Sequence, residues 1–246
     1  MNGISILMYH RVGRFGPVSN HRALFCDYRQ FAAQMAYLNY MRYQVLSMDE
    51  ALNLLRGNQP LPRRAVALTF DDGYQDFRDY ALPTLARYGF PATVYAIAGD
   101  IGQRAHWLTT DGMEAAPLLD AAGLREIQAA GITVGSHARS HSRMAELAPE
   151  EQAAQARDSR TLLEDLLGAP VRHFCYPYGS YNAASLAAVE QAGYHSAVTC
   201  LRATATAAFD PLALPRKAIS YGDNLLGYFW KLQMKHRPKR EPLRRA

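Results

Sequence analysis

Residues 65–74 decide the fold: they read AVALTFDDGY, an apolar run that ends in two adjacent carboxylates and a glycine. Such a run is typical of a buried strand that carries its chemistry at its carboxyl end. Neighbouring side chains on a strand point to opposite faces, so Asp71 and Asp72 can serve one site only if Asp72 lies on a turn, which Gly73 permits. The sequence therefore predicts different roles for the two aspartates.

Strand and helix patterns alternate on both sides of this segment. Short apolar runs predict strands near the amino terminus and over 43–46, 91–97, 132–136, 171–176 and 194–199, and helical spacing predicts helices over 27–40, 47–55, 74–88, 124–130, 149–167 and 182–192. Residues 13–26 are expected to form a long loop over the site, and residues 99–123 an excursion from the barrel. This alternation, in a chain of 246 residues, predicts a single α/β domain with parallel strands inside and helices outside.

Composition excludes several classes of protein. Hydrophobic residues make up 49% and charged residues 20%, and no run of about 18 apolar residues marks a membrane span. Cys26, Cys175 and Cys200 lack metal-like spacing, so we expect free thiols in a reducing compartment. The first residues show no signal peptide, so we expect a cytoplasmic protein unless the chain has been trimmed.

Positive charge is concentrated at the carboxyl end. Residues 231–246 carry seven basic side chains and one acidic one, and the rest of the chain is close to neutral. We expect a catalytic domain over residues 1–230 and a basic tail over 231–246. Aromatic and aliphatic residues precede the tail, a pattern that suits either peripheral contact with an anionic membrane, at the inner face of the cytoplasmic membrane, or a solvated terminus. Nucleic-acid binding is not expected, because the body of the chain has no basic excess.

A second polar cluster follows the predicted strand 132–136. His137 and His141 lie four residues apart, a spacing that would align both imidazoles on one helical turn. Two histidines and one carboxylate form a set of three ligands that leaves positions on a divalent metal open for water or substrate. The pattern therefore predicts a catalytic metal site.

The order of these motifs resembles that of the polysaccharide deacetylases, the NodB-homology family of carbohydrate esterases. The resemblance rests on the TFDDG run at 69–73, the His137 and His141 pair and the FCYPYG run at 174–179. The opening ILMYHRV run at 6–12 is similar to the circularly permuted branch that contains the poly-N-acetylglucosamine deacetylases. The implied fold is a distorted (β/α)7-type barrel.

The resemblance also implies a role for each site residue. Asp72, His137 and His141 would hold the metal, and Asp71 would be the general base that deprotonates the attacking water. The backbone N–H of Tyr178 would face the oxyanion. His10, at the end of the first strand, would protonate the departing amine. Without the resemblance, His10 reads as a core histidine and Asp71 as a second metal ligand or a turn-capping residue. The His137 and His141 pair then reads as a solvated or core pair, and the turn that contains Tyr178 as an ordinary Pro-X-Gly turn.

The sequence departs from the family pattern at two positions. Ala138 stands where the family usually has Ser or Thr, so a supporting hydrogen bond would be lost. Cys175 stands where many members have the arginine that braces the catalytic aspartate. Arg216 is our candidate for that bracing role, with a plain surface arginine as the alternative. Trp107 and Tyr176 are candidates for stacking on a sugar ring, or for packing.

These observations together predict a metal-dependent N-deacetylase of an N-acetylated amino sugar in a poly- or oligosaccharide or a lipid-linked saccharide. Zn²⁺ is the expected ion, and Co²⁺, Ni²⁺ or Fe²⁺ would fit the same ligands. Three alternatives remain open at this point: an O-acetyl esterase acting on a glycan, a degenerate glycan-binding protein, and a non-haem iron oxygenase, which uses the same three ligand types.

Overall fold

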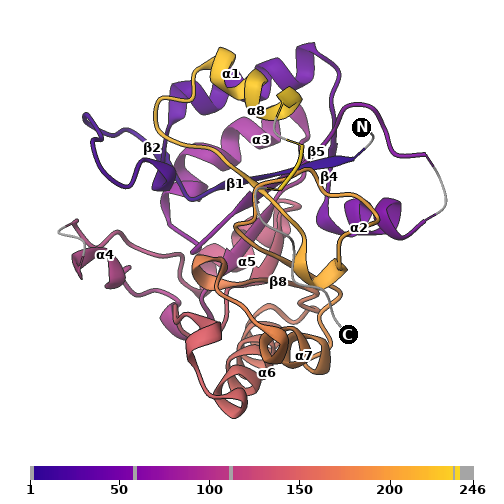
Figure 1. Ribbon diagram of the computed structural model, residues 1–246. Coiled ribbons are helices and arrows are strands. Elements are labelled where there is room, and N and C mark those ends of the chain that lie inside the picture. The colour runs from indigo at the N-terminus through magenta and orange to yellow at the C-terminus, as the bar shows by residue number, and fades with distance from the viewer. Residues whose placement is uncertain (1–2, 58–59, 111–112, 235, 239–246) are drawn as a thin grey trace.

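The strands form a curled, parallel sheet with helices around it in the computed structural model, which describes residues 3–57, 60–110, 113–234 and 236–238 (Figure 1). The main sheet contains β1 (Ile4–Tyr9), β4 (Gln44–Leu46), β5 (Ala65–Phe70), β6 (Thr93–Ala96), β7 (Thr133–Ser136), β8 (His173–Cys175), β9 (Ser196–Val198) and β10 (Lys217–Ala218). Its order is β10-β1-β5-β6-β7-β8-β9, with β4 paired to β5.

The pairing explains how the sheet curls. Strand β4 pairs with the first half of β5, and β6 pairs with its last two residues, so β5 changes neighbours along its length. A parallel bridge between Val198 and Leu214 links the end of β9 to the chain that leads into β10, which in turn pairs with β1. The two edges of the sheet therefore approach each other, and the expected distorted α/β barrel is confirmed.

Helices follow the strands in the alternating order. They are α1 (Tyr28–Tyr40), α2 (Met48–Arg56), α3 (Leu82–Tyr88), α4 (Trp107–Thr110), α5 (Ala121–Ala129), α6 (Pro149–Leu167), α7 (Ala183–Gln191) and α8 (Leu225–Met234). Figure 1 shows α1, α3 and α8 together on one side of the sheet, with α6 and α7 on the opposite side. Side chains start two helices as expected: Asp27 accepts from the Arg29 N–H, and Ser47 forms a capping box with Glu50.

Strand alternation divides the core in two. Val66, Leu68 and Phe70 of β5 pack outward against the helices, in one large cluster. Ala65 and Ala67 point the other way, into a second cluster inside the barrel that α2 helps to close. Asp71 continues this inward series at the end of β5, so the strand places its carboxylate inside the mouth of the barrel.

One of two expectations about the chain's course needs correction. Residues 13–26 are not one long loop, because β2 (Arg11–Gly13) pairs in parallel with β3 (Phe25–Asp27). The Arg11 guanidinium, which packs over the rings of Phe15, Phe25 and Tyr74, holds this small sheet against the barrel. Residues 99–123 do leave the barrel, and they form a small core of their own around Tyr74.

The expected boundary between residues 230 and 231 falls inside α8, which continues to Met234. Lys231 donates to the carbonyl of Ala218 and pairs with Asp223, and Leu232 is buried, so these residues belong to the barrel. Residues 235 and 239–246 of the expected tail lie outside the described residues. None of the described helices has the length and apolar character needed to cross a membrane.

Candidate metal centre and active site

The two aspartates after β5 diverge because the chain turns between them. Asp72 has φ 71° and Gly73 has φ 74°, so two consecutive residues adopt the left-handed conformation. The expected turn is confirmed. It directs Asp71 into the barrel and swings Asp72 toward the loop that follows β7.

Asp72 meets both histidines of the second motif. Its Oδ1 atom lies 3.2 Å from His137 Nε2 and 3.4 Å from His141 Nε2, and all three side chains are almost fully covered by protein. Asp72 Oδ1 has no hydrogen-bond partner among the described atoms, although it is buried. A buried oxygen without a partner, facing two imidazole nitrogens, has the chemistry of a cation site, so these residues fit a divalent metal.

The backbone of β8 sets the tautomer of His137. His137 Nδ1 lies 2.8 Å from the Cys175 carbonyl oxygen, which can only accept a hydrogen bond, so Nδ1 carries the proton. Nε2 is then the ring nitrogen that faces Asp72 and that a metal would bind. A partner of this kind on the second ring nitrogen is the usual support for a metal-binding histidine.

The helical alignment expected for the two histidines is wrong. Residues 137–141 form a loop after β7 (Thr133–Ser136), and Ala138 takes a left-handed φ of 64°. This residue reverses the chain direction, so that His137 and His141 face each other with ring centroids 5.2 Å apart. The four-residue spacing gives the expected convergence by a different backbone path.

Arg216 contacts the other aspartate through both arms of its guanidinium. Its Nη1 donates to Asp71 Oδ1 at 2.6 Å and its Nη2 donates to Asp71 Oδ2 at 2.7 Å. Arg216 Nε donates to the Thr199 carbonyl, and Nη1 also donates to Thr69 Oγ1. Arg216 is therefore a buried, fixed partner of Asp71, and Cys175 Sγ lies 3.2 Å from its Nη2.

These contacts decide the charge of both carboxylates. Burial disfavours ionisation of Asp71, but the Arg216 guanidinium more than offsets burial and holds the pKa of this carboxyl below its usual range. Burial also opposes ionisation of Asp72, yet the His141 and His137 rings hold the pKa of its carboxyl well below the usual range. Both aspartates are therefore ionised at neutral pH.

A second group of potential ligands exists, but its chemistry is less suitable. Asp71, His137 and Cys175 also offer ligand atoms within 4.8 Å of one another. Both oxygens of Asp71 already bind a cation, the Arg216 guanidinium, and burial raises the pKa of the Cys175 thiol. Asp72, His137 and His141 are therefore the better candidates for a metal.

His10 and Tyr178 complete the residues expected at this site. His10 follows β1, and its Nε2 lies 3.9 Å from Asp71 Oδ2. Tyr178 follows β8 in a left-handed conformation, and its ring lies 4.4 Å from the His141 ring. The Arg143 guanidinium lies over the Tyr178 ring, 4.3 Å from its centroid. The seven residues expected to bind the metal or to take part in the reaction thus form one connected group. Asp72 contacts His137 and His141, Tyr178 contacts His141, Asp71 contacts Arg216 and His10, and an Asp71 oxygen lies within 4.8 Å of a His137 ring nitrogen.

The two aromatic candidates for sugar stacking differ. Trp107 of α4 lies with its ring 4.4 Å from the His141 ring, next to the candidate metal site. Tyr176 is fully buried and donates its hydroxyl hydrogen to the Leu212 carbonyl, so it cannot stack on a sugar. Sequence reasoning missed Thr69 and Thr199, the two residues that hold Arg216. Thr69 stands two positions before Asp71, and strand alternation is the signal that could have identified it.

Comparison with known proteins identifies the same family that the motifs of the site resemble. A family model described as polysaccharide deacetylase matches residues 58–197. YxkH of Bacillus subtilis, a protein named for the polysaccharide deacetylases, is 32% identical over 219 residues, which cover 89% of this chain and 72% of YxkH. The poly-beta-1,6-N-acetyl-D-glucosamine N-deacetylase of Staphylococcus epidermidis is 24% identical over 238 residues, which cover 89% of this chain and 80% of that protein.

Solved structures of members of this family have the same fold as this chain. The deacetylase PplD of Streptococcus pyogenes, determined in complex with acetate, superposes with a TM-score of 0.81 at 27% identity, covering 94% of this chain and 98% of PplD. IcaB of Ammonifex degensii superposes with a TM-score of 0.78 at 25% identity, covering 94% of this chain and 98% of IcaB. The chain belongs to the polysaccharide deacetylase family. It is a member of the carbohydrate deacetylases, with relatives named as poly-N-acetylglucosamine deacetylases.

Proposed function

We propose that this protein is a metal-dependent hydrolase that removes the N-acetyl group from an N-acetylated amino sugar in a saccharide chain. The proposal rests on the different contacts of the two adjacent aspartates. Asp72 faces two imidazole nitrogens, and Asp71 is paired with the Arg216 guanidinium. The Asp72 carboxylate is thus available to bind a metal cation, and the Asp71 carboxylate is available to accept a proton from water. Amide hydrolysis by water needs both functions.

The metal would be held by Asp72, His137 and His141, and Zn²⁺ suits this donor set, as do Co²⁺, Ni²⁺ and Fe²⁺. When bound, the cation supplies a Lewis acid that polarises the acetyl carbonyl and lowers the pKa of water. The proton on His137 Nδ1 leaves Nε2 free to be a ligand.

Asp71 is the general base in this proposal. Its carboxylate is kept ionised by Arg216, and an oxygen of it lies within 4.8 Å of a His137 ring nitrogen, so it borders the position where water would attack. Arg216 is a positioning residue: it fixes both oxygens of Asp71 and does not itself face the substrate.

His10 and Tyr178 provide the remaining functions. His10 Nε2 lies 3.9 Å from Asp71 Oδ2, and a proton on this ring would be given to the departing amine. The backbone N–H of Tyr178 would donate to the oxyanion that develops on the acetyl carbonyl. Trp107, beside His141, offers an apolar ring face for the sugar.

Acetate release tests the proposal. We expect the purified protein to release acetate from N-acetylated oligosaccharides, to lose this activity after treatment with a chelator, and to regain it with Zn²⁺. Release from O-acetylated saccharides alone would replace the proposal with an O-acetyl esterase. Glycan binding without acetate release under any metal would indicate a degenerate binding protein, and activity unchanged by the chelator would contradict the metal.

A further inference from the structure

Helix α8 (Leu225–Met234) is apolar on its outer face as well as on the face that packs against the barrel. Tyr228 and Leu232 are buried against the barrel, as expected for an outer helix. On the opposite face, Leu226 is 75%, Trp230 52% and Met234 56% exposed. An outer helix of a barrel usually carries polar residues there, because that face meets water. The outer face of α8 therefore has the composition of a covered surface.

The exposed side chains form a continuous stripe. Leu226, Phe229, Trp230 and Met234 recur at intervals of three and four residues, so they lie along one side of the helix. We call these four residues the apolar stripe. Four large apolar side chains in one row are more than the scattered exposed residues that ordinary surfaces show.

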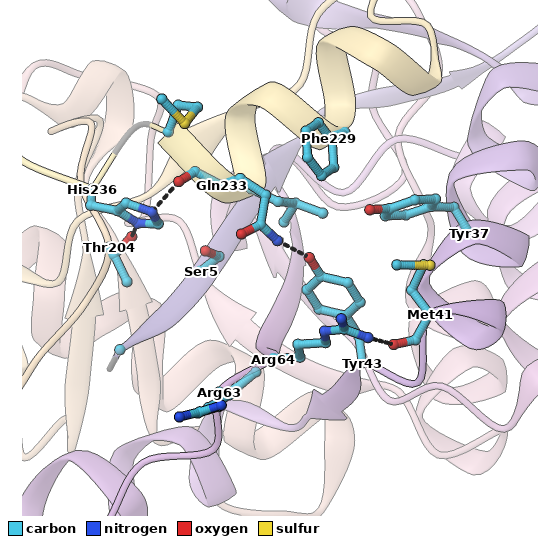
Figure 2. Close-up of a pocket in the computed structure, with 14 residues that line it drawn as sticks. Ser5, Tyr37, Met41, Tyr43, Arg63, Arg64, Thr204, Phe229, Gln233 and His236 are labelled. Atoms are coloured by element: carbon cyan, nitrogen blue, oxygen red, sulfur yellow. Dashed lines mark hydrogen bonds between the residues drawn. The ribbon is translucent and has the colours of Figure 1, made fainter. Parts of the chain in front are cut away.

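A cavity of about 660 Å³ adjoins α8, and Figure 2 shows Phe229 of the stripe among the residues that line it. Phe229 and Met234 line it from α8, and Tyr37 lines it from α1. Gly3 and Ser5, at the beginning of β1, also line it, whereas His10 follows the end of the same strand. The cavity and the candidate active site therefore lie at opposite ends of the barrel.

The charged side chains that line this cavity are basic. Arg63 and Arg64, from the segment before β5, carry this charge. His236, which follows α8, also lines the cavity, but burial lowers the pKa of its ring, so it adds little charge at neutral pH. No carboxylate side chain is among the described residues that line it. Arg64 also donates to the Met41 carbonyl, which fixes its position at the rim.

A buried ammonium group adds to this charge. Lys217 Nζ donates to Ser5 Oγ at 3.0 Å and to the Leu232 carbonyl at 3.2 Å, and both of these residues line the cavity. Within the described parts of the chain, no carboxylate pairs with Lys217. The sequence that follows α8 continues the pattern, because residues 235–246 contain six basic residues and one acidic residue. An anionic group in the cavity would offset this positive charge.

We propose that the apolar stripe and the cavity together form a docking surface for an anionic lipid bilayer. The stripe would enter the boundary between headgroups and acyl chains, and the cavity would take a phosphate headgroup. A second copy of this chain is a poorer occupant, because a symmetric contact through α8 would bring the basic groups of both copies together. The barrel end that carries the candidate active site would stay free to receive a saccharide.

Vesicle binding by the full-length chain tests this proposal. We expect the protein to sediment with vesicles that contain phosphatidylcholine and about one third phosphatidylglycerol, to bind pure phosphatidylcholine at least tenfold more weakly, and to dissociate as salt is raised. Trp230 emission should shift to shorter wavelength on binding. The double variant Leu226→Ser/Trp230→Ser should bind at least tenfold more weakly, whereas Leu162→Ser, an exposed leucine on α6, should bind as the wild type does.

The cavity is tested by Arg63→Gln, with Arg87→Gln on α3 as the matched control. We expect Arg63→Gln to weaken binding to the anionic vesicles several-fold and to reduce its salt dependence, and Arg87→Gln to change neither. Circular dichroism and acetate release should be unaltered in all these variants, which shows that they fold.

Three results would overturn the proposal. If the wild-type protein does not bind anionic vesicles, or if Leu226→Ser/Trp230→Ser binds them as tightly as wild type does, α8 does not contact the bilayer. Sedimentation that shows a dimer in wild type and a monomer in Leu226→Ser/Trp230→Ser assigns the stripe to a second copy. If Arg63→Gln and Arg87→Gln bind anionic vesicles equally well, the cavity is not part of the docking surface.

Discussion

Removal of Arg216 should affect both the stability and the pH dependence of the enzyme. The Arg216→Met variant keeps an apolar side chain of similar length in the barrel but leaves Asp71 buried without its cation. Breaking a buried ion pair from one side costs about 3–5 kcal/mol, because the remaining charge has lost its compensation. We therefore expect the free energy of unfolding at pH 7 to fall by about this amount, as measured by urea denaturation.

The pH dependence follows from the same contact. In the wild type, Arg216 holds the pKa of the Asp71 carboxyl below its usual range, so its stabilising contribution is present above the ordinary pKa and is lost as the pH falls through the lower, folded-state value. Without Arg216, burial raises the pKa of this carboxyl. The acid limb of the kcat/KM profile for acetate release should then move to higher pH.

Two further variants separate charge from geometry. Arg216→Lys keeps a positive charge but cannot contact both oxygens of Asp71, so we expect intermediate stability and intermediate activity. The double variant Arg216→Met/Asp71→Asn should recover part of the lost stability, because no buried charge remains unpaired. The reasoning is refuted if Arg216→Met is as stable as wild type and its acid limb does not move.

Three other predictions concern His10, Lys217 and Gly73. His10→Gln should lower kcat for N-acetylated substrates by about 10²- to 10⁴-fold but have much less effect on an aryl acetate, whose leaving group needs no proton; equal losses would exclude His10 as the acid. Burial lowers the pKa of Lys217 from 10.5 to about 8, so between these values the unfolded chain binds more protons and stability rises with pH. Lys217→Met should remove that rise and add about 1–3 kcal/mol at pH 7 in urea denaturation, and an unchanged pH slope would contradict this. Gly73→Ala should cost about 1–2 kcal/mol because of its positive φ, measured against Gly16→Ala, which has open space around it; equal effects would argue against the turn.

Local signals made much of the fold predictable from the sequence. The bounds of α6, Pro149–Leu167, follow from its polar helical pattern between a proline and a glycine. The turn at Asp72 and Gly73 follows from strand alternation, because two adjacent aspartates can share a site only if the chain turns between them.

Features that depend on distant contacts were harder to predict. The partnership of Arg216 with Asp71 joins residues that lie 145 positions apart, and the sequence alone left a surface arginine as an alternative. The path from His137 to His141 was predicted wrongly, because helical spacing and the loop with its left-handed Ala138 both bring the two rings together. The exposed apolar face of α8 could not be predicted for a similar reason, because exposure depends on which side of the helix the barrel covers.

Metal content, measured together with acetate release, tests the division of labour between the two aspartates most directly. We predict that wild type binds one Zn²⁺ per chain, that Asp71→Asn keeps the metal but loses acetate release, and that Asp72→Ala loses both. Equal loss of metal in Asp71→Asn and Asp72→Ala, or full metal binding by Asp72→Ala, would contradict the account.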